Sequence, residues 1–511
     1  MGIGARLLRI RAGETRMALT LVGLMLVTSA GAGIGGTASD ALLFARYGTA
    51  ALPQLYLALG VVSFVCALGV SAVFGRVRRE RVYPAALVAL AALLVAVRAI
   101  LLTGSDAAYP VMWLAANVVL MLQGIVAWGV ASWLCDARQA RRLFPVANAA
   151  KILGTIVGTA SVGAFLVVAR LDDLLIVWSV ALVGALLVVV RIRGDAPATL
   201  VRTATPLREE LLIGFRIVRT SSLLRWLAVS LVLFSVLFFA LALPFTRAAR
   251  AAMPDERDLA SFLGVFNATT TAAAFCASLF VAERFYARFG VVNAILVFTL
   301  IYLAGFVTLV ATGSFLVIAA IRWIQMAWLA GMADAAYQAL FNPVPPDRRD
   351  QMRAFMEGVP GQAGIALAGL LLMTGDLAFD PRAVALGGAV AAAATFAVIW
   401  RTRGAYREAL VSALRAGRPE PFLGADDSYG RLLADRAAVR TLLGGARSED
   451  VATRRASLQM LADVAVPEAR DALLAAATDD DAVVRAHALR GGARLAPQAF
   501  VDAARDALAM P

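Results

Sequence analysis

The chain has 511 residues, of which 61% are hydrophobic and 16% are charged, and its mean hydropathy is +0.77. A typical soluble domain is about a quarter charged residues. A single soluble domain cannot hide this much apolar surface from water, so that class is excluded, and so is disorder. The net charge is +13, from 48 basic and 35 acidic residues, and its placement decides whether it indicates nucleic-acid binding.

The charges divide the chain near residue 400. Residues 1–400 hold 32 basic and 20 acidic residues among long apolar runs, whereas residues 401–511 hold 16 basic and 15 acidic residues. Runs of about 20 apolar residues predict membrane-spanning helices. Twelve runs qualify: 17–44, 52–74, 83–103, 108–134, 145–169, 173–191, 224–246, 258–282, 290–312, 313–340, 358–375 and 381–400.

The basic residues of the membrane part are distributed unequally between its two sides. With the N-terminus inside, 23 of the 32 lie on the cytoplasmic side, six lie on the opposite side and three lie within apolar runs. This asymmetry follows the positive-inside rule. We therefore expect both termini in the cytoplasm, in a bacterial-type inner membrane. Because topology accounts for the surplus charge, we expect no nucleic-acid partner.

Two segments of the membrane part share the pattern D-x-R-x-x-x-R-x-F at an offset of 211 residues, after the fourth and tenth runs. Transporters are often built from repeated halves. We therefore predict two pseudo-symmetric six-helix bundles, 1–190 and 224–400. The central loop 191–223 joins them and includes an amphipathic stretch, 207–218, that is predicted to lie along the membrane surface.

The repeated pattern supplies candidate gating residues. Asp and Arg in a short cytoplasmic loop can pair with helix ends and with each other, holding the two halves shut on that side. The alternative is positive-inside topology with snorkelling arginines. The residues concerned are Asp136, Arg138, Arg142, Asp347, Arg349 and Arg353.

Lys151 is the only lysine of the chain, and it lies two turns into the fifth apolar run. An ionisable group inside a bilayer costs roughly 3 kcal/mol or more, so it is a candidate functional residue. Asn148 shares its helix face. A lysine here can bind an anionic solute as a compact point charge. The alternative is a lysine that snorkels to the cytoplasmic headgroups.

Other polar residues recur at membrane depth in both halves, as a central cavity requires. Arg322 lies too deep to snorkel easily and is predicted to neutralise cargo with Lys151. Gln123, Asn267 and Gln362 are predicted to orient it. Two carboxylates are candidates for coupling transport to an ion. They are Asp40, which can instead cap a helix or pair with Arg46, and Asp334, which can instead pair with Arg348 or Arg349.

Patterns of enzyme chemistry are absent from the sequence. The sole histidine is His487, and there is no phosphate-binding loop, nucleophile elbow or cluster with metal-ligand spacing. We therefore predict no catalytic residue, no metal site and no cofactor.

The segment 401–511 contains an internal repeat with an offset of 31 residues. The offset matches Leu442 with Leu473, Asp450 with Asp481, and Arg454 with Arg485. Paired short helices at this period predict an α-solenoid, and the pattern D-x-x-x-R-x-x-x-L resembles the HEAT repeat. This cytoplasmic helical domain is predicted either to bind a protein partner or to pack on the membrane part.

Twelve helices in two halves with a basic central loop resemble the major facilitator superfamily. Three segments resemble its ATP/ADP translocase-like branch of nucleotide transporters: 42–48 (LLFARYG), 141–145 (RRLFP) and 342–358, from NPVP to RAFMEG. Some bacterial members of that branch are similar in carrying HEAT-like tails. The resemblance implies alternating access, with a nucleotide or another phosphorylated anion as cargo.

The sequence therefore predicts an all-α polytopic membrane protein with a small helical-repeat domain. Its predicted function is secondary active transport of an organic, anionic, nucleotide-like or phosphorylated solute. The alternative is a non-transporting membrane scaffold or sensor that signals through its tail. A continuous polar cavity between the halves favours transport, and a dry apolar seam favours the scaffold.

Overall fold

The structure is a computed structural model that describes residues 15–74, 79–135, 137–192, 207–415, 436–462, 467–501 and 504–505. All of the regular elements in these residues are helices. Twelve of them are long and apolar enough to cross a membrane. The structure therefore confirms the predicted all-α membrane architecture and its twelve spans.

The first six spans form one bundle, the N-half. Helix α2 continues without a break into a short π-helix, η1, so the first span ends at Tyr47. The helices are α2 (Thr15–Leu42), η1 (Leu43–Tyr47), α3 (Leu52–Phe74), α4 (Arg79–Leu101), α5 (Ala108–Leu134), α6 (Ala137–Val168), η2 (Leu171–Asp173) and α7 (Leu174–Ile192).

The last six spans form the C-half, preceded by the amphipathic helix α8. Two of its spans are interrupted by π-turns, η3 and η4. The helices are α8 (Leu207–Thr220), α9 (Ser222–Ala252), α10 (Glu256–Phe280), α11 (Ala282–Phe289), α12 (Val291–Ala311), α13 (Phe315–Trp328), η3 (Leu329–Ala333), α14 (Asp334–Ala339), α15 (Pro346–Met356), η4 (Glu357–Gly361), α16 (Gln362–Ala378) and α17 (Pro381–Arg415).

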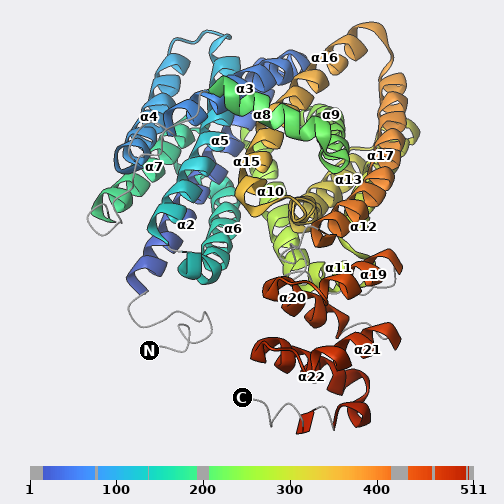
Figure 1. The fold of residues 1–511 in the computed structure, drawn as a ribbon. Helices are drawn as coiled ribbons and strands as arrows, with labels where there is room; N and C mark the ends of the chain where they lie inside the picture. The colour runs from blue at the N-terminus through green and yellow to red at the C-terminus, as the bar shows by residue number, and fades with distance from the viewer. Residues whose placement is uncertain are drawn as a thin grey trace.

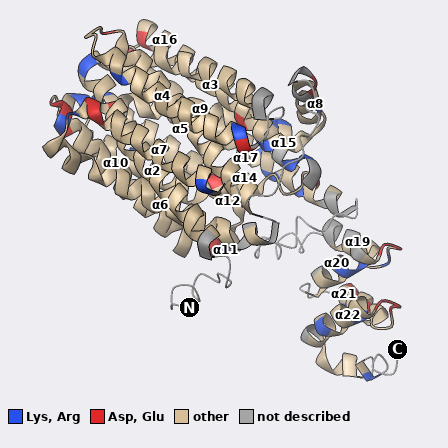
Figure 2. Ribbon diagram, turned by 90° about the vertical axis from the view of Figure 1, so that its left-hand side faces the viewer, with Lys and Arg blue, Asp and Glu red and all other residues tan. Residues whose placement is uncertain are grey.

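The two halves lie side by side, with the blue-to-teal N-half next to the green-to-orange C-half (Figure 1). Their main contacts join α3 to α16 and α6 to α10. In each contact, the second span of one half packs against the fifth span of the other half. Charged residues gather at the ends of the bundle and the long middle is almost free of them (Figure 2). We call the end where α2 begins and α17 ends the tail face, and the end where η1 and the start of α10 lie the far face.

Glycines bring the two halves into contact near the far face. A Cβ on Gly60 of α3 would lie 2.5 Å from the backbone nitrogen of Ala366, and a Cβ on Gly264 of α10 would lie 2.5 Å from the carbonyl oxygen of Thr159. Gly60 and Gly264 are 204 residues apart, as are the first residues of α3 and α10. The same seam contact therefore occurs twice, as the predicted internal repeat requires.

Two predicted boundaries are wrong. The D-x-R-x-x-x-R-x-F segments were expected in loops, but α6 begins at Ala137 and α15 spans Pro346–Met356. Pro346 favours this start because proline is well accommodated in the first turn of a helix. The last membrane helix does not end at residue 400, because α17 continues as one helix to Arg415. Hydropathy marks where the apolar run ends, whereas the backbone stays helical beyond it.

The glycine-rich stretch at 31–36 forms a close helix contact. Helix α2 runs through it without interruption. A Cβ on Gly31 would lie 2.5 Å from Ala181 Cβ, and a Cβ on Gly35 would overlap the ring of the fully buried Trp178. These glycines therefore allow α7 to pack directly on α2.

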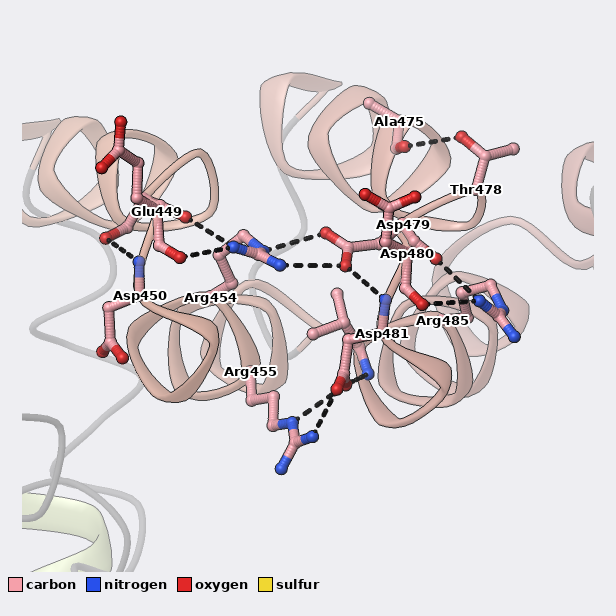
Figure 3. A network of polar contacts seen from close by, with 12 residues as sticks. Glu449, Asp450, Arg454, Arg455, Ala475, Thr478, Asp479, Asp480, Asp481 and Arg485 are labelled. Carbon is pink, nitrogen blue, oxygen red and sulfur yellow. Dashed lines mark hydrogen bonds and ion pairs between the residues drawn. The ribbon is translucent and has the colours of Figure 1, made fainter.

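The tail consists of α19 (Arg436–Gly445), α20 (Val451–Leu461), α21 (Pro467–Ala476), α22 (Ala482–Leu495) and η5 (Pro497–Phe500). Leu442, Leu461 and Ala469 pack with Leu410 near the end of α17, which attaches the tail to the last span. Arg454 and Arg485 each donate through Nη1 to the backbone carbonyls six and five residues earlier, at 2.9–3.1 Å (Figure 3). The offset of 31 residues therefore corresponds to a repeated local structure.

Candidate solute-binding site

A cavity of about 280 Å³ lies between the two halves, and we call it the inner chamber. It is contributed by α2, α5 and α6 of the N-half and by α10, α13 and η3 of the C-half. Small and hydroxyl side chains dominate its wall. The lining residues are Ala32, Gly33, Gly36, Thr37, Ser39, Asp40, Ala116, Asn117, Leu120, Thr155, Thr159, Asn267, Thr270, Thr271, Met326 and Ala330.

A second cavity of about 240 Å³, the vestibule, adjoins the inner chamber on the tail side. The two share the wall residues Ala32, Gly33, Leu120 and Thr155. The vestibule is further lined by Met25, Thr28, Ser29, Gln123, Gly124, Ala127, Trp128 and Lys151. Together they extend from Lys151 toward the far face, with mostly apolar walls that carry a few hydroxyl, amide and charged groups, as small-molecule sites in proteins usually do.

Most hydroxyl groups of this wall are bonded to their own helix. Thr155, Thr159, Thr270 and Thr271 each donate to a carbonyl oxygen four residues earlier. Such bonds are common for threonine in helices. Each hydroxyl oxygen can still accept a hydrogen bond, because a hydroxyl has two acceptor lone pairs. The hydroxyl wall is therefore chiefly an acceptor surface.

Asp40 is the acidic residue of the inner chamber. Its Oδ1 accepts a hydrogen bond of 2.7 Å from Trp113 Nε1, and no described group donates to Oδ2. The carboxylate thus neither caps a helix nor pairs with Arg46, which binds Glu256 and Asp172 instead. One carboxylate oxygen therefore remains available for a solute or a proton.

Asn267 enters the inner chamber from the C-half. It is half-buried, and its side-chain amide makes no hydrogen bond with a described residue. The neighbouring Asn117 uses Nδ2 to bond the carbonyl of Trp113 at 2.9 Å, which leaves its Oδ1 as an acceptor. The two amides therefore offer donors and acceptors from both halves.

Lys151 is exposed at the vestibule wall, and no described residue pairs with it or accepts a hydrogen bond from it. The structure thus places a basic residue at the entrance, on the tail side of the inner chamber. Asn148 is one turn nearer the tail face and is exposed, but it lines neither the vestibule nor the inner chamber.

The two predicted glutamines lie in packed positions. The Gln123 amide donates to Thr28 O at 3.0 Å and accepts from Trp178 Nε1 at 2.8 Å, so it joins three helices of the N-half. Gln362 begins α16, and its Oε1 is buried without a partner among the described residues. Gln123 borders the vestibule with its amide occupied, whereas Gln362 lines neither cavity.

Arg322 lies inside the C-half. Its side chain is buried, its Nη1 donates to Gln325 Oε1 at 2.7 Å, and its guanidinium lies 4.3 Å from the ring centre of Phe238. Gln325 in turn donates to Tyr302 Oη at 3.0 Å. Arg322 does not line either cavity, and its charge is held by an internal network.

An ion-pair cluster that the sequence analysis missed joins the two halves at the far face. Arg46 of η1 binds both oxygens of Glu256 of α10, through Nε at 2.7 Å and Nη2 at 3.0 Å. Its Nη1 lies 3.2 Å from Asp172, which is almost fully buried. Arg250 of α9 donates to Ala45 O at 2.8 Å. The far face is therefore closed by polar contacts across the seam.

Two of the predicted gating residues, Arg349 and Arg353, have described side chains, and both donate to carbonyl groups of the C-half. Arg349 donates to the carbonyls of Asn342 and Val344 at 2.8 and 3.2 Å, and Arg353 donates to that of Gln338 at 3.2 Å. These contacts hold α15 against the end of α14. Asp136 lies outside the described residues, and the side chains of Arg138, Arg142 and Asp347 lie outside them as well.

The sequence matches no protein-family model and no curated protein. The fold does match solved structures. The nucleoside transporter NupG superposes with a TM-score of 0.54 at 12% identity, over 76% of this chain and 98% of that chain. A bacterial homologue of the iron transporter ferroportin, in an inward-facing state, gives 0.56 at 13%, over 76% and 98%.

A third structure, a POT family transporter in complex with a thioalcohol-conjugated peptide, gives a TM-score of 0.56 at 11% identity, over 75% of this chain and 96% of that one. All three are transporters of the major facilitator type. This chain has their fold. At these identities the likeness extends to architecture alone, and the cargo must be argued from the residues of the two cavities.

Proposed function

We propose that this protein is a secondary active transporter that moves a small polar organic solute by alternating access. The observation that carries the proposal is the inner chamber between the two halves and the adjoining vestibule, whose walls carry Asp40, Asn267 and Lys151. The far face is closed across the seam by the Arg46–Glu256 pair. A central site that is closed toward one side of the membrane is what alternating access requires. These features favour transport over a membrane scaffold.

We further propose that the cargo carries one acidic group and several hydrogen-bond donors. Lys151 is the only basic residue in the walls of the two cavities, because Arg322 is held inside the C-half. Asp40 and the hydroxyl wall of the inner chamber favour donor groups such as hydroxyls or a protonated amine. A triphosphate would place several negative charges beside one cation and one carboxylate, so a polyanion such as ATP fits this site poorly.

The remaining assignments complete the proposal. Asp40, whose Oδ2 has no described partner, is proposed to exchange the coupling proton. The protein is proposed to lie in a bacterial-type inner membrane with the tail face in the cytoplasm, since this face carries most of the basic residues. The repeated Arg454 and Arg485 contacts support a HEAT-like nature for the tail.

The test is uptake into proteoliposomes. A panel of labelled nucleosides, nucleoside monophosphates, ATP, amino acids and dipeptides is compared with and without an imposed proton gradient. We expect uptake of a monoanionic or zwitterionic member, little uptake of ATP, and loss of uptake in Lys151→Gln and Asn267→Ala. Asn293→Ala is the matched control, because this half-buried asparagine lines neither cavity and its side chain donates to the carbonyl of Phe289.

Two outcomes would contradict the proposal. If no solute of the panel crosses the membrane, in a preparation whose fold is intact by circular dichroism, the scaffold function becomes the better explanation. If ATP is the preferred cargo and Lys151→Gln transports it normally, transport stands but the assigned site is wrong. Retention of the gradient response in Asp40→Asn would remove Asp40 from the coupling step.

A further inference from the structure

Lys151 and Asp334 lie at the same level of the bundle, on helices of opposite halves. Thr155 of α6 and Ala330 of η3 line the inner chamber from opposite halves. Lys151 precedes Thr155 by one helical turn, and Asp334 follows Ala330 by one turn. Helix α6 runs away from the tail face and the tenth span runs toward it. Lys151 is therefore nearer the tail face than Thr155, and Asp334 is nearer the tail face than Ala330. The two charges therefore lie at the same level, one turn nearer the tail face than the inner chamber.

Neither charge is committed to a partner in its own half. Both residues are exposed, and neither side chain makes a hydrogen bond or an ion pair within 4.0 Å with a described residue. The structure thus holds two unlike charges at one level of opposite halves, and they are not in contact.

At the far face, where the two halves are in contact, an unlike pair forms direct hydrogen bonds. There Arg46 and Glu256, also from opposite halves, form a bidentate pair at 2.7 and 3.0 Å. Rocking of the halves that opens the far face brings the tail-side ends of α6 and α14 together. We propose that Lys151 and Asp334 then form the latch that holds the tail face shut. This inference rests on the proposed alternating-access function.

The arginines of the repeated pattern are less suited to this role. Arg349 and Arg353 already donate to carbonyl oxygens of their own half. A latch built from them would have to break these bonds first. Lys151 and Asp334 lose only water when they meet, and they gain a charge-assisted hydrogen bond.

The experiment uses the full chain in lipid nanodiscs, with Cys66, Cys135 and Cys276 replaced by serine and a reporter cysteine introduced by Ser261→Cys. Ser261 lies in the far-face seam, where a Cβ on Gly163 would be 3.4 Å from its hydroxyl. A bulky maleimide therefore labels it only when the far face opens. Because labelling is irreversible, even a rare opening registers as a rate.

We expect Lys151→Glu and Asp334→Lys each to slow labelling about tenfold, since each removes the latch of the far-open state. The double reversal, Lys151→Glu with Asp334→Lys, restores the rate because the pair is rebuilt with exchanged charges. The matched control reverses Arg191 and Glu283, two exposed residues on the tail side away from the seam, and leaves the rate unchanged.

Each other result overturns the inference. Single reversals that label at the parent rate, or a double reversal as slow as the singles, exclude the latch, and the proposed transport function of the parent protein still stands. Misfolding is excluded by comparing melting curves, and recovery in the double variant excludes it independently. If the parent protein is never labelled and takes up no solute, the proposed transport function itself is contradicted.

Discussion

The same spans reach the far face and the tail face of the bundle, but the contacts between the two halves differ at the two faces. At the far face, backbone approaches backbone at Gly60 and Gly264, and Arg46 is bound to Glu256. Toward the tail face, Lys151 lies in the vestibule wall, and it makes no ion pair with Asp334 of the other half. Pseudo-symmetry therefore fixes where the halves touch, whereas side chains particular to each end determine which end is closed.

The largest expected effect comes from Gly60. A leucine there places its Cβ against the backbone of Ala366, so α3 and α16 must separate. Overpacking of this kind costs about 1–3 kcal/mol. We expect Gly60→Leu to lower the melting temperature in detergent. Gly69→Leu, in the same helix but with no atom within 4 Å of its added Cβ, is the control. Equal melting temperatures would show that the seam is not tightly packed.

A smaller effect is expected from Glu256→Gln, which weakens the pair across the seam. The matched control is Asp376→Asn. Asp376 pairs with Arg247 within the C-half, and the acids of the two pairs are almost equally exposed, at 30% and 29%. Partly exposed pairs contribute about 0.5–1 kcal/mol, so Glu256→Gln should raise the far-face opening rate about two- to fivefold. The Ser261→Cys labelling assay measures it. A similar increase in Asp376→Asn would mean that the location of the pair is irrelevant.

The smallest effect is expected outside the membrane. The hydrogen bond from Arg455, with backbone N–H groups of α22, lowers the pKa of Asp481 from 3.8 to about 2. A lowered pKa in the folded state stabilises the tail above pH 3.8, and this contribution is lost as the pH falls through 2. Amide exchange at Val483 and Val484 should therefore accelerate over this interval. Asp481→Asn should remove this acceleration and leave far-face labelling unchanged.

Much of the fold follows from the sequence because hydropathy and charge placement are local properties. The twelve spans and the amphipathic helix α8 can be predicted without tertiary information. The offset of 31 residues can be found from the sequence of the tail alone. The glycine seam escaped prediction because the repeat does not keep one offset. Gly60 and Gly264 are 204 residues apart, whereas the D-x-R-x-x-x-R-x-F segments are 211 apart.

The candidate site was predicted in part. Lys151, Asn267 and Asp40 line the two cavities, but Arg322 and Gln362 do not. Depth along a helix shows that a polar residue is inside the membrane, and it does not show which neighbour the residue faces. The Arg46–Glu256 pair is joined across 210 residues of sequence, and each partner alone looks like an ordinary charge beside a membrane.

Helix α17 spans 35 residues without a break, a length of about 50 Å at 1.5 Å per residue. Its first part packs in the C-half against α9 and α12, and its end carries the tail through Leu410. The last span is therefore a continuous helical connection between the C-half and the tail. A tilt of the C-half in the proposed alternating-access cycle would move the tail through a larger arc than any residue inside the membrane. A fluorophore pair on the tail and on the N-half would follow the transport cycle of a single molecule.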